Sequence, residues 1–324
     1  MSADTADRTD SSRPGRYRNP LERFFSTTFG LSRGTNADPA GVRGSPVDFT
    51  AKASAPTVLP GYLDEPGRYL WAAHAQRGLG AYERYLQGEG DEWLDAARRA
   101  ADVLVEQQAE TGAWLQLRPY PHTYSIAAPW LSSMAQGEGA SLLVRVHLET
   151  GEDRYAEAAL RALRPMRVPS AEGGAAAELA GTLFPEEYPT DPPSFVLNGG
   201  IFALWGLRDV AVGLGDADAA ADFERCVGAL AASIDRWDTG AWSRYDLYPH
   251  RVTNIASPAY HELHVIQLEA THEMAPRPEL AAAAERFAAY SASPVRRAAA
   301  FARKALFRAA VPRGERAARL LPWA

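Results

Sequence analysis

Apolar residues recur at helical spacing through most of the chain beyond Tyr62, in Ala-rich stretches that Gly or Pro interrupts. The stretches come in pairs, and their periodicity predicts four helical hairpins. The predicted pairs are 71–87 with 91–108, 133–150 with 153–163, 201–212 with 217–234, and 260–274 with 279–290. The first three breaks fall at Gly88, Gly151 and Gly213 or Gly215, about 63 residues apart, and Pro276 and Pro278 interrupt the fourth pair. Gly or Pro at such a break suits the turn of a helical hairpin.

Two loop segments repeat at twice this period. Residues 111–122 read TGAWLQLRPYPH and residues 239–250 read TGAWSRYDLYPH, identical at seven of twelve positions and 128 residues apart. Repeated hairpins must stack to bury their apolar faces, either as an open solenoid or as a closed ring. Long loops rich in Trp, Tyr and Pro favour the ring, because such loops on a rigid scaffold usually carry function. The predicted fold class is therefore all-α: an α/α toroid (barrel) of repeated helical hairpins with long aromatic-rich loops carrying the active site.

The two ends of the chain differ from this body. Residues 1–45 are polar and lack periodicity, which predicts a mobile leader before an α/α-barrel catalytic domain over 46–290. Residues 291–324 predict a basic amphipathic C-terminal helix or tail, in which Arg and Lys alternate with Phe301, Leu306 and Phe307. This tail either contacts an anionic membrane or glycan, or packs its aromatic residues on the body.

Composition narrows the partners and the compartment. The chain has 324 residues, 46% of them hydrophobic, and a formal charge of −6, which argues against nucleic-acid binding. The single cysteine, Cys226, excludes an intramolecular disulfide. Neither a signal peptide nor a run of about 18 apolar residues is visible. A cytoplasmic location is therefore expected, with the basic tail a candidate for peripheral contact at the inner face of the membrane. The oligomeric state stays open, a homodimer included.

Candidate chemistry gathers in three segments, 186–199, 237–247 and 260–264, together with Trp130 and 134–138. Aromatic faces suit sugar rings, whose C–H faces stack on them, while hydroxyl groups and histidines reach the polar edges. A sugar-binding site with acid–base residues is therefore expected.

Four segments carry a family resemblance. SSMAQGEGASLLVRVHLETGEDRY, EEYPTDPPSFVLNGGIFALWGLRDV, DTGAWSRYDL and YHELHVIQL, in this order, resemble the conserved C-terminal domain of the D-glucuronyl C5-epimerases, over roughly residues 125–270. The resemblance implies an α/α-barrel catalytic domain, in agreement with the repeats. It also implies conversion of D-glucuronate to L-iduronate in a heparosan-like, anionic uronic-acid polysaccharide, and the chemistry requires no metal or organic cofactor.

The resemblance also implies site residues. Its acid–base tyrosines match Tyr188, Tyr245 and Tyr260, and its glutamate matches Glu187. The animal enzymes have an arginine just after the YDL motif, where this chain has Tyr248, and Arg244 or Arg118 is a candidate substitute. The further substrate-binding candidates are Trp130, Gln136, Asn198, Trp242, Arg244, His250, His261 and His264.

Other readings stay open. A uronate lyase shares the proton abstraction at C5 and then eliminates the 4-O substituent. A glycoside hydrolase needs two carboxyl groups, and Glu187 could pair with Glu138, Asp238 or Asp246. A non-catalytic glycan-binding protein is the third alternative. His261 and His264 share a helix face, but further ligands for zinc are not evident, so no metal site is predicted.

Overall fold

Paired helices build the protein, as seen in a computed structural model that describes residues 32–55, 57, 69–117, 123–124 and 126–311. The hairpins are α2 (Trp71–Leu86) with α3 (Asp91–Gln107), α4 (Ser133–Thr150) with α5 (Asp153–Ala162), α6 (Leu197–Leu214) with α7 (Ala217–Ser233), and α8 (Pro258–Met274) with α9 (Pro278–Ser291). A further helix, α10 (Pro294–Ala310), follows. The four predicted hairpins and the all-α class are confirmed.

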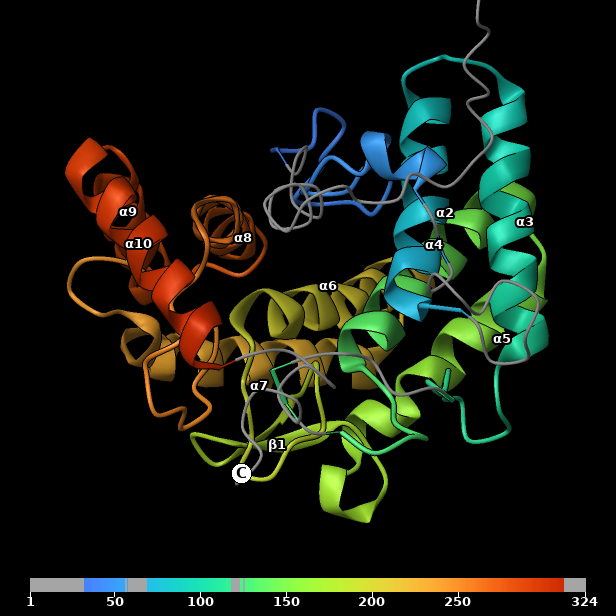
Figure 1. Ribbon diagram of the computed structural model, residues 1–324. Helices are drawn as coiled ribbons and strands as arrows, with labels where there is room; N and C mark the ends of the chain where they lie inside the picture. Colours follow the sequence, from blue (N-terminus) through green and yellow to red (C-terminus); the bar gives the residue numbers. More distant parts are fainter. Residues whose placement is uncertain (1–31, 56, 58–68, 118–122, 125, 312–324) are drawn as a thin grey trace, which may run out of the picture.

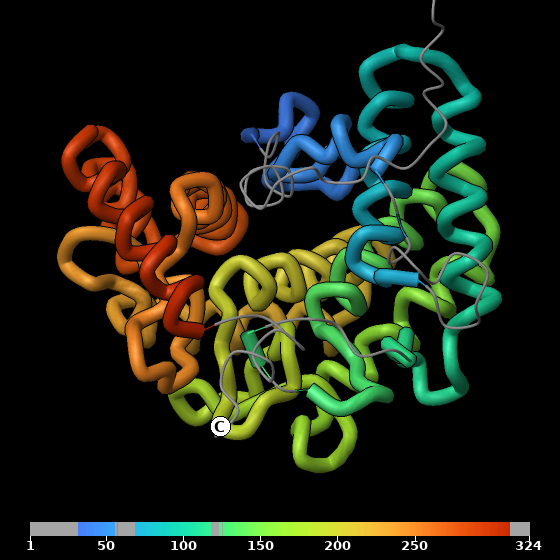
Figure 2. The backbone as a smooth tube through the Cα atoms, in the orientation of Figure 1, coloured from blue at the N-terminus to red at the C-terminus, as the bar shows by residue number. Residues whose placement is uncertain are grey.

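The hairpins form two layers. Helices α2, α4, α6 and α8 pack side by side in a curved row, and α3, α5, α7 and α9 lie outside them (Figure 1). This is the layering of an α/α toroid, with α2 and α8 at the two ends of the row. A short segment containing η1 (Thr50–Ser54) lies between those ends (Figure 2).

Local sequence explains where the helices begin and end. Gly151 and Gly215 follow α4 and α6 with φ of 70° and 69°, a left-handed conformation that glycine adopts without steric cost. The Ser132 and Ser257 side chains accept hydrogen bonds from backbone N–H groups in the first turns of α4 and α8. The hairpin boundaries are therefore encoded locally.

Helix α6 begins four residues earlier than predicted. Gly199 and Gly200 lie in its first turn, where they permit close packing rather than ending a loop. A Cβ atom on Gly199 would lie 2.1 Å from Oε2 of Glu187, and one on Gly200 would lie 2.7 Å from the Phe184 ring. The two glycines therefore let the Glu187 segment approach the helix.

The segment before α6 contains a β-hairpin that the sequence interpretation missed. Strands β1 (Ala176–Leu179) and β2 (Thr182–Pro185) pair antiparallel around a tight turn at Ala180 and Gly181. Three short helices complete the connections: η2 (Arg164–Arg167), η3 (Ser170–Glu172) and η4 (Ile234–Trp237). The hairpin leads directly into the Glu186–Glu187 pair of the predicted site.

Part of the predicted leader is packed on the helices. Val42 and Val47 are buried in the main core. Arg145 of α4 donates to the carbonyl oxygen of Gly44 over 3.3 Å and pairs with Asp209 of α6 over 2.6 Å. Residues 32–45, predicted as mobile, are therefore held against α4 and α6, whereas residues 1–31 lie outside the described residues.

The basic C-terminal segment forms α10, and one side of that helix packs on the body. Ala300, Lys304 and Phe307 are buried, whereas Val295 and Leu306 are 78% and 61% exposed. The structure thus has the packed arrangement, and membrane contact by the exposed side stays a prediction. Residues 312–324 lie outside the described part. Within the described ranges, no helix is long and apolar enough to cross a membrane.

Candidate active site

Tyrosines from three separate loops meet in one cluster, called here the tyrosine cluster. Its aromatic members are Tyr124, Trp130, Tyr188, Tyr245, Tyr248 and Tyr260. Ring centroids of Tyr188 lie 5.7 Å from Trp130 and 5.3 Å from Tyr124. Those of Tyr245 and Tyr260 lie 5.2 Å apart. Because these residues precede or begin α4, α6 and α8, the cluster lies where those three helices start.

Two adjacent glutamates border the cluster, and they differ in role. Glu186 accepts hydrogen bonds from the Phe195 amide over 2.7 Å and from the Ser194 hydroxyl over 2.8 Å. These bonds hold the loop that enters α6, where Phe195 has a φ of 43°. Burial raises the pKa of Glu186 to about 7, against the hydrogen bonds that lower it. Glu186 is thus a structural carboxyl group.

Glu187 adjoins the reactive tyrosine that the resemblance implies. Burial is the main cause that raises the pKa of Glu187 to about 8, and the charges of Glu186 and Asp246 act in the same direction. A hydrogen bond with Tyr188 lowers it. Its Oε2 atom has no partner among the described residues. At neutral pH Glu187 is therefore mainly protonated, and its buried Oε2 atom, which faces Gly199, forms no hydrogen bond within the described structure.

A buried aspartate ties the remaining loops together. Asp246 Oδ2 accepts hydrogen bonds from the Tyr124 hydroxyl and from Asn254 Nδ2, the latter over 2.5 Å, and lies 3.3 Å from His250 Nε2. Burial, followed by the charge of Asp246, holds the pKa of Tyr124 well above its usual range. Tyr124 therefore stays protonated. Sequence reasoning missed Tyr124 and Asn254 as site residues, although Tyr124 lies in one of the aromatic loops.

Three predicted substrate contacts, Trp242, His261 and His264, belong to a separate buried group. Together with Ser243 they form what is called here the histidine knot. The Trp242 and His261 rings stack with centroids 3.8 Å apart. The Ser243 hydroxyl lies 2.7 Å from Nδ1 of His261 and 2.9 Å from Nδ1 of His264. Burial lowers the pKa of His261 to about 4 and that of His264 well below its usual value. Both rings are neutral, and the knot braces the loop that precedes α8.

Other predicted contacts are dispersed. The side-chain amide of Gln136 forms three hydrogen bonds with backbone atoms. It accepts from the Trp114 amide over 2.8 Å and donates to the carbonyl oxygens of Gly112 and Ala162 over 2.9 and 2.8 Å. The structure therefore places it within the body, away from the tyrosine cluster.

Asn198 lies in the first turn of α6, where its carbonyl oxygen accepts from Gln267 over 3.0 Å. Its Oδ1 atom has no partner among the described residues. The Arg244 amide donates to the Trp237 carbonyl oxygen over 2.7 Å. His250 joins the edge of the cluster, 5.7 Å from the Tyr124 ring. Arg118 lies outside the described residues.

The carboxyl groups that a hydrolase would need are distributed differently. Glu138 is buried in α4, accepts from Gln76 over 2.9 Å, and has its pKa raised well above the usual value, mainly by burial. Asp238 instead forms a turn with Gly240 and an ion pair with Arg286. Of the three partners considered for Glu187, only Asp246 contacts the tyrosine cluster.

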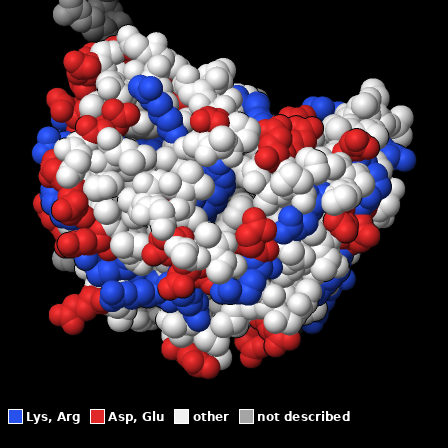
Figure 3. Space-filling model, turned by 180° about the vertical axis from the view of Figure 1, so that it is seen from behind, with Lys and Arg blue, Asp and Glu red and all other residues white. Residues whose placement is uncertain are grey.

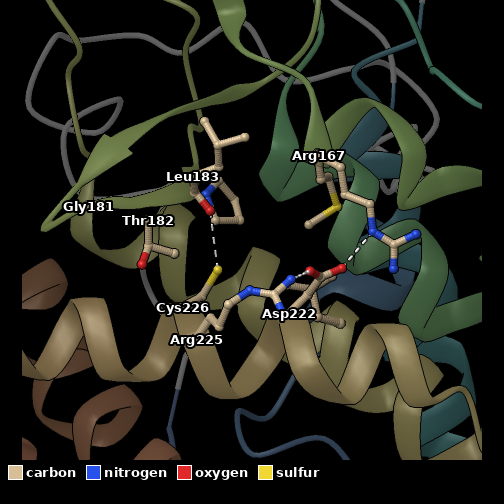
Figure 4. A pocket seen from close by; sticks show the side chains of 10 residues that line it. Arg167, Gly181, Thr182, Leu183, Asp222, Arg225 and Cys226 are labelled. Carbon is tan, nitrogen blue, oxygen red and sulfur yellow. Dashed lines mark hydrogen bonds and ion pairs between the residues drawn. The ribbon is translucent and has the colours of Figure 1, made fainter.

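A cavity of about 370 Å³ lies elsewhere, beside β2 and α7 (Figure 4). Asp222 pairs there with Arg167 over 2.6 Å and with Arg225, and Cys226 donates to the Leu183 carbonyl oxygen over 3.5 Å. Burial raises the pKa of the Cys226 thiol to about 12. The described lining contains no member of the tyrosine cluster, and the arginines already have carboxylate partners.

On the face seen in Figure 3, acidic and basic side chains are interspersed.

Fold and candidate site together define a class of protein: a scaffold of stacked helical hairpins that carries a cluster of tyrosines, with a buried glutamate of raised pKa beside it, at the start of its inner helices. Residues 107–289 match the family model described as the D-glucuronyl C5-epimerase C-terminus, which is more than half of the chain. The chain belongs to this family.

Individual relatives match parts of the chain. A D-glucuronyl C5-epimerase of Caenorhabditis elegans is 33% identical over 192 residues, which are 52% of this chain and 30% of that protein. An uncharacterized protein of Methanocaldococcus jannaschii is 28% identical over 209 residues, which are 63% of this chain and 62% of that one. The chain thus spans less than two thirds of either relative.

Among solved structures, an unsaturated glucuronyl hydrolase from Bacillus sp. GL1 aligns with a TM-score of 0.45 and 17% identity, covering 68% of this chain and 61% of that one.

Proposed function

We propose that this protein is a polysaccharide uronate C5-epimerase that converts D-glucuronate to L-iduronate residues in a heparosan-like glycan. The observation that carries the proposal is the meeting of Tyr188 and Tyr245 in one buried cluster, with Glu187, whose pKa burial raises to about 8, beside Tyr188. Membership of the epimerase family supports the same reaction class.

The first chemical requirement is a more acidic C5–H bond. C5 lies next to the uronate carboxylate, and removal of its proton builds negative charge on that carboxylate, which must be stabilised. The Glu187 carboxyl group, protonated at neutral pH, can donate a hydrogen bond to it. Helices α4, α6 and α8 all begin at the cluster, and the N-terminal end of a helix carries partial positive charge that favours an anion.

The second requirement is one proton acceptor and one proton donor on opposite faces of the sugar. Tyr188 and Tyr245 come from different loops, before α6 and α8, and Tyr124 lies against Tyr188. The C5–H bond breaks as one tyrosine, in its phenolate form, takes the proton, and the electron pair moves into the carboxylate. The other tyrosine gives its hydroxyl proton to C5 from the opposite face, which inverts the centre.

The test is incubation with heparosan in D2O, followed by proton NMR. Deuterium at C5 with L-iduronate signals is the expected result. A new C4–C5 double bond would indicate a lyase, and new reducing ends without unsaturation would indicate a hydrolase. Binding without any turnover would contradict the enzyme proposal for this glycan.

A further inference from the structure

Helix α10 lies outside the matched residues 107–289, yet it contacts the tyrosine cluster. Its Lys304 side chain is 2% exposed, and the Nζ atom lies 5.1 Å from the centroid of the Tyr245 ring. One turn further along, the Phe307 ring lies 5.1 Å from that of His250. The C-terminal helix therefore forms part of the wall behind the site.

Hydrogen bonds connect Lys304 with the loop that carries Tyr245. Lys304 Nζ donates to Asn254 Oδ1 over 2.7 Å and to the Ile255 carbonyl oxygen over 2.8 Å. Asn254 in turn accepts from the Tyr245 amide over 2.8 Å through its backbone oxygen and donates to Asp246 through its side chain. One lysine thus fixes the residue that holds both Tyr245 and Asp246.

The lysine also brings a buried charge to this place. Its charge adds to the burial that lowers the pKa of His264, so its field reaches the start of α8. Further ionisable groups lie near Tyr245 among the described residues: Tyr124 interacts with it electrostatically, Tyr260 packs on its ring, Tyr188 and Tyr248 belong to the same cluster, and Asp246 follows it in the chain. Asp246 disfavours a second negative charge, whereas an ammonium group attracts one, and this attraction is stronger in a buried site than in water.

We propose that Lys304 is a positioning residue of the active site, which holds the Tyr245 loop through Asn254 and favours the phenolate form of Tyr245 as the base for C5. The proposal rests on the proposed function, since it concerns the base of that reaction. It makes α10 a required part of the site, although this helix lies beyond the family match.

Two substitutions separate the charge from the hydrogen bonds. Lys304→Gln removes the charge and keeps a donor for Asn254, whereas Lys304→Arg keeps the charge. Arg303→Gln, on the exposed side of the same helix, is the matched control. The measurement is the rate of C5 deuterium exchange against pH. The rate of general base catalysis follows the fraction of phenolate. We therefore expect Lys304→Gln to lower the rate at neutral pH about tenfold or more, and to shift the rising limb of the plot of rate against pH to higher pH.

Lys304→Arg should restore the position of that limb, and Arg303→Gln should match the wild type. An unshifted limb in Lys304→Gln would overturn the proposal, whatever its rate.

A second readout does not depend on turnover. The ultraviolet phenolate absorbance of the wild type minus that of Tyr245→Phe reports ionisation of Tyr245. The same difference in the Lys304→Gln background should appear at higher pH, and an unchanged difference would contradict the inference. If the wild type shows no C5 exchange on any uronate glycan while Lys304→Gln still moves this titration, the proposed function fails and the electrostatic role of Lys304 stands.

Discussion

The tyrosine cluster and the histidine knot are built from the same kinds of residue and differ in what is left unsatisfied. In the knot, Ser243 engages Nδ1 of both histidines, the His261 Nε2 atom lies 2.9 Å from the Phe287 carbonyl oxygen, and Nε2 of the neutral His264 ring has no partner among the described residues. In the cluster, a buried glutamate has its pKa raised to about 8 and keeps an oxygen without a partner in the described structure. Perturbed, incompletely satisfied groups are typical of functional sites.

Neighbouring residues of one motif can therefore serve different purposes. Tyr260 and His261 are adjacent in α8, and successive residues of a helix point about 100° apart. Tyr260 packs against Tyr245, whereas His261 packs against Trp242. When a whole motif is assigned to substrate binding, residues that face the candidate site and residues that only support it are treated alike.

The largest expected effect comes from removing a tyrosine hydroxyl of the cluster. Tyr188→Phe and Tyr245→Phe should each lower L-iduronate formation by about 100- to 10,000-fold, the usual contribution of a general acid or base. Product NMR with heparosan measures this, and the thermal midpoint should stay within a few degrees of the wild type. The matched control is Tyr155→Phe, whose hydroxyl contacts Asp102 among the outer helices. Loss of activity in that control would remove the contrast.

Glu187 should make stability depend on pH in a direction set by its raised pKa. Its pKa is about 8 in the fold and about 4.5 in the unfolded chain, so only the unfolded state loses the proton between these values. The free energy of unfolding therefore falls as pH rises from 4.5 to 8. Glu187→Gln should remove this loss. The free energy of unfolding of Glu187→Gln minus that of the wild type should therefore be several kcal/mol larger at pH 8 than at pH 5.

Urea unfolding of both proteins at the two pH values checks the prediction. An equal difference between the proteins at pH 5 and at pH 8 would show that the Glu187 proton is not held by the fold.

Substitutions in the histidine knot should lower stability and leave turnover nearly unchanged, whereas substitutions of the tyrosines should lower turnover and leave stability nearly unchanged. Ser243→Ala removes the hydroxyl that lies against both Nδ1 atoms. His261 Nδ1 keeps the backbone amide of residue 243, which donates to it over 3.1 Å, whereas buried His264 Nδ1 loses its hydroxyl partner, which should cost about 1–3 kcal/mol of unfolding free energy. Exchange at C5 per folded molecule should change little. Urea titration and deuterium exchange on the same preparation test this. A large loss of turnover with full stability would place the knot in the catalytic site.

The histidine knot should also make the protein less stable in acid, through His261. Its pKa is lowered to about 4 in the fold, so the unfolded state takes up a proton first as pH falls below about 6.5. The stability that this neutral ring contributes is present above pH 6.5 and is lost as pH falls toward 4. His261→Phe keeps an aromatic ring against Trp242 and should reduce the slope of unfolding free energy between these values.

Local sequence signals predicted the scaffold well. Gly151, with its positive φ, and the Ser132 cap mark helix ends by chemistry that acts within a few residues. The predicted start of α6 was wrong because Gly199 is inside the helix, where it allows close contact with Glu187, a residue outside the helix. The repeated loop motif conserves a turn and a buried indole: Gly112 and Gly240 both have positive φ, and Trp114 and Trp242 are both buried.

The candidate site could be predicted only in part, because its composition depends on contacts between residues far apart in the sequence. Tyr188, Tyr245 and Tyr260 came from the family resemblance, and the structure brings them together. Lys304 could not be recognised, since in the sequence it is one basic residue among many in the tail. Its burial arises when α10 packs against the loop at Asn254, 50 residues earlier.

The most direct test of the account is the location of deuterium in heparosan after incubation in D2O with Tyr188→Phe and with Tyr245→Phe. With Tyr245 as the base toward D-glucuronate, Tyr188→Phe should still introduce deuterium at C5 of D-glucuronate while forming almost no L-iduronate. Tyr245→Phe should introduce neither. Retained exchange and inversion in Tyr245→Phe would contradict the assignment of this tyrosine cluster as the site of C5 proton transfer.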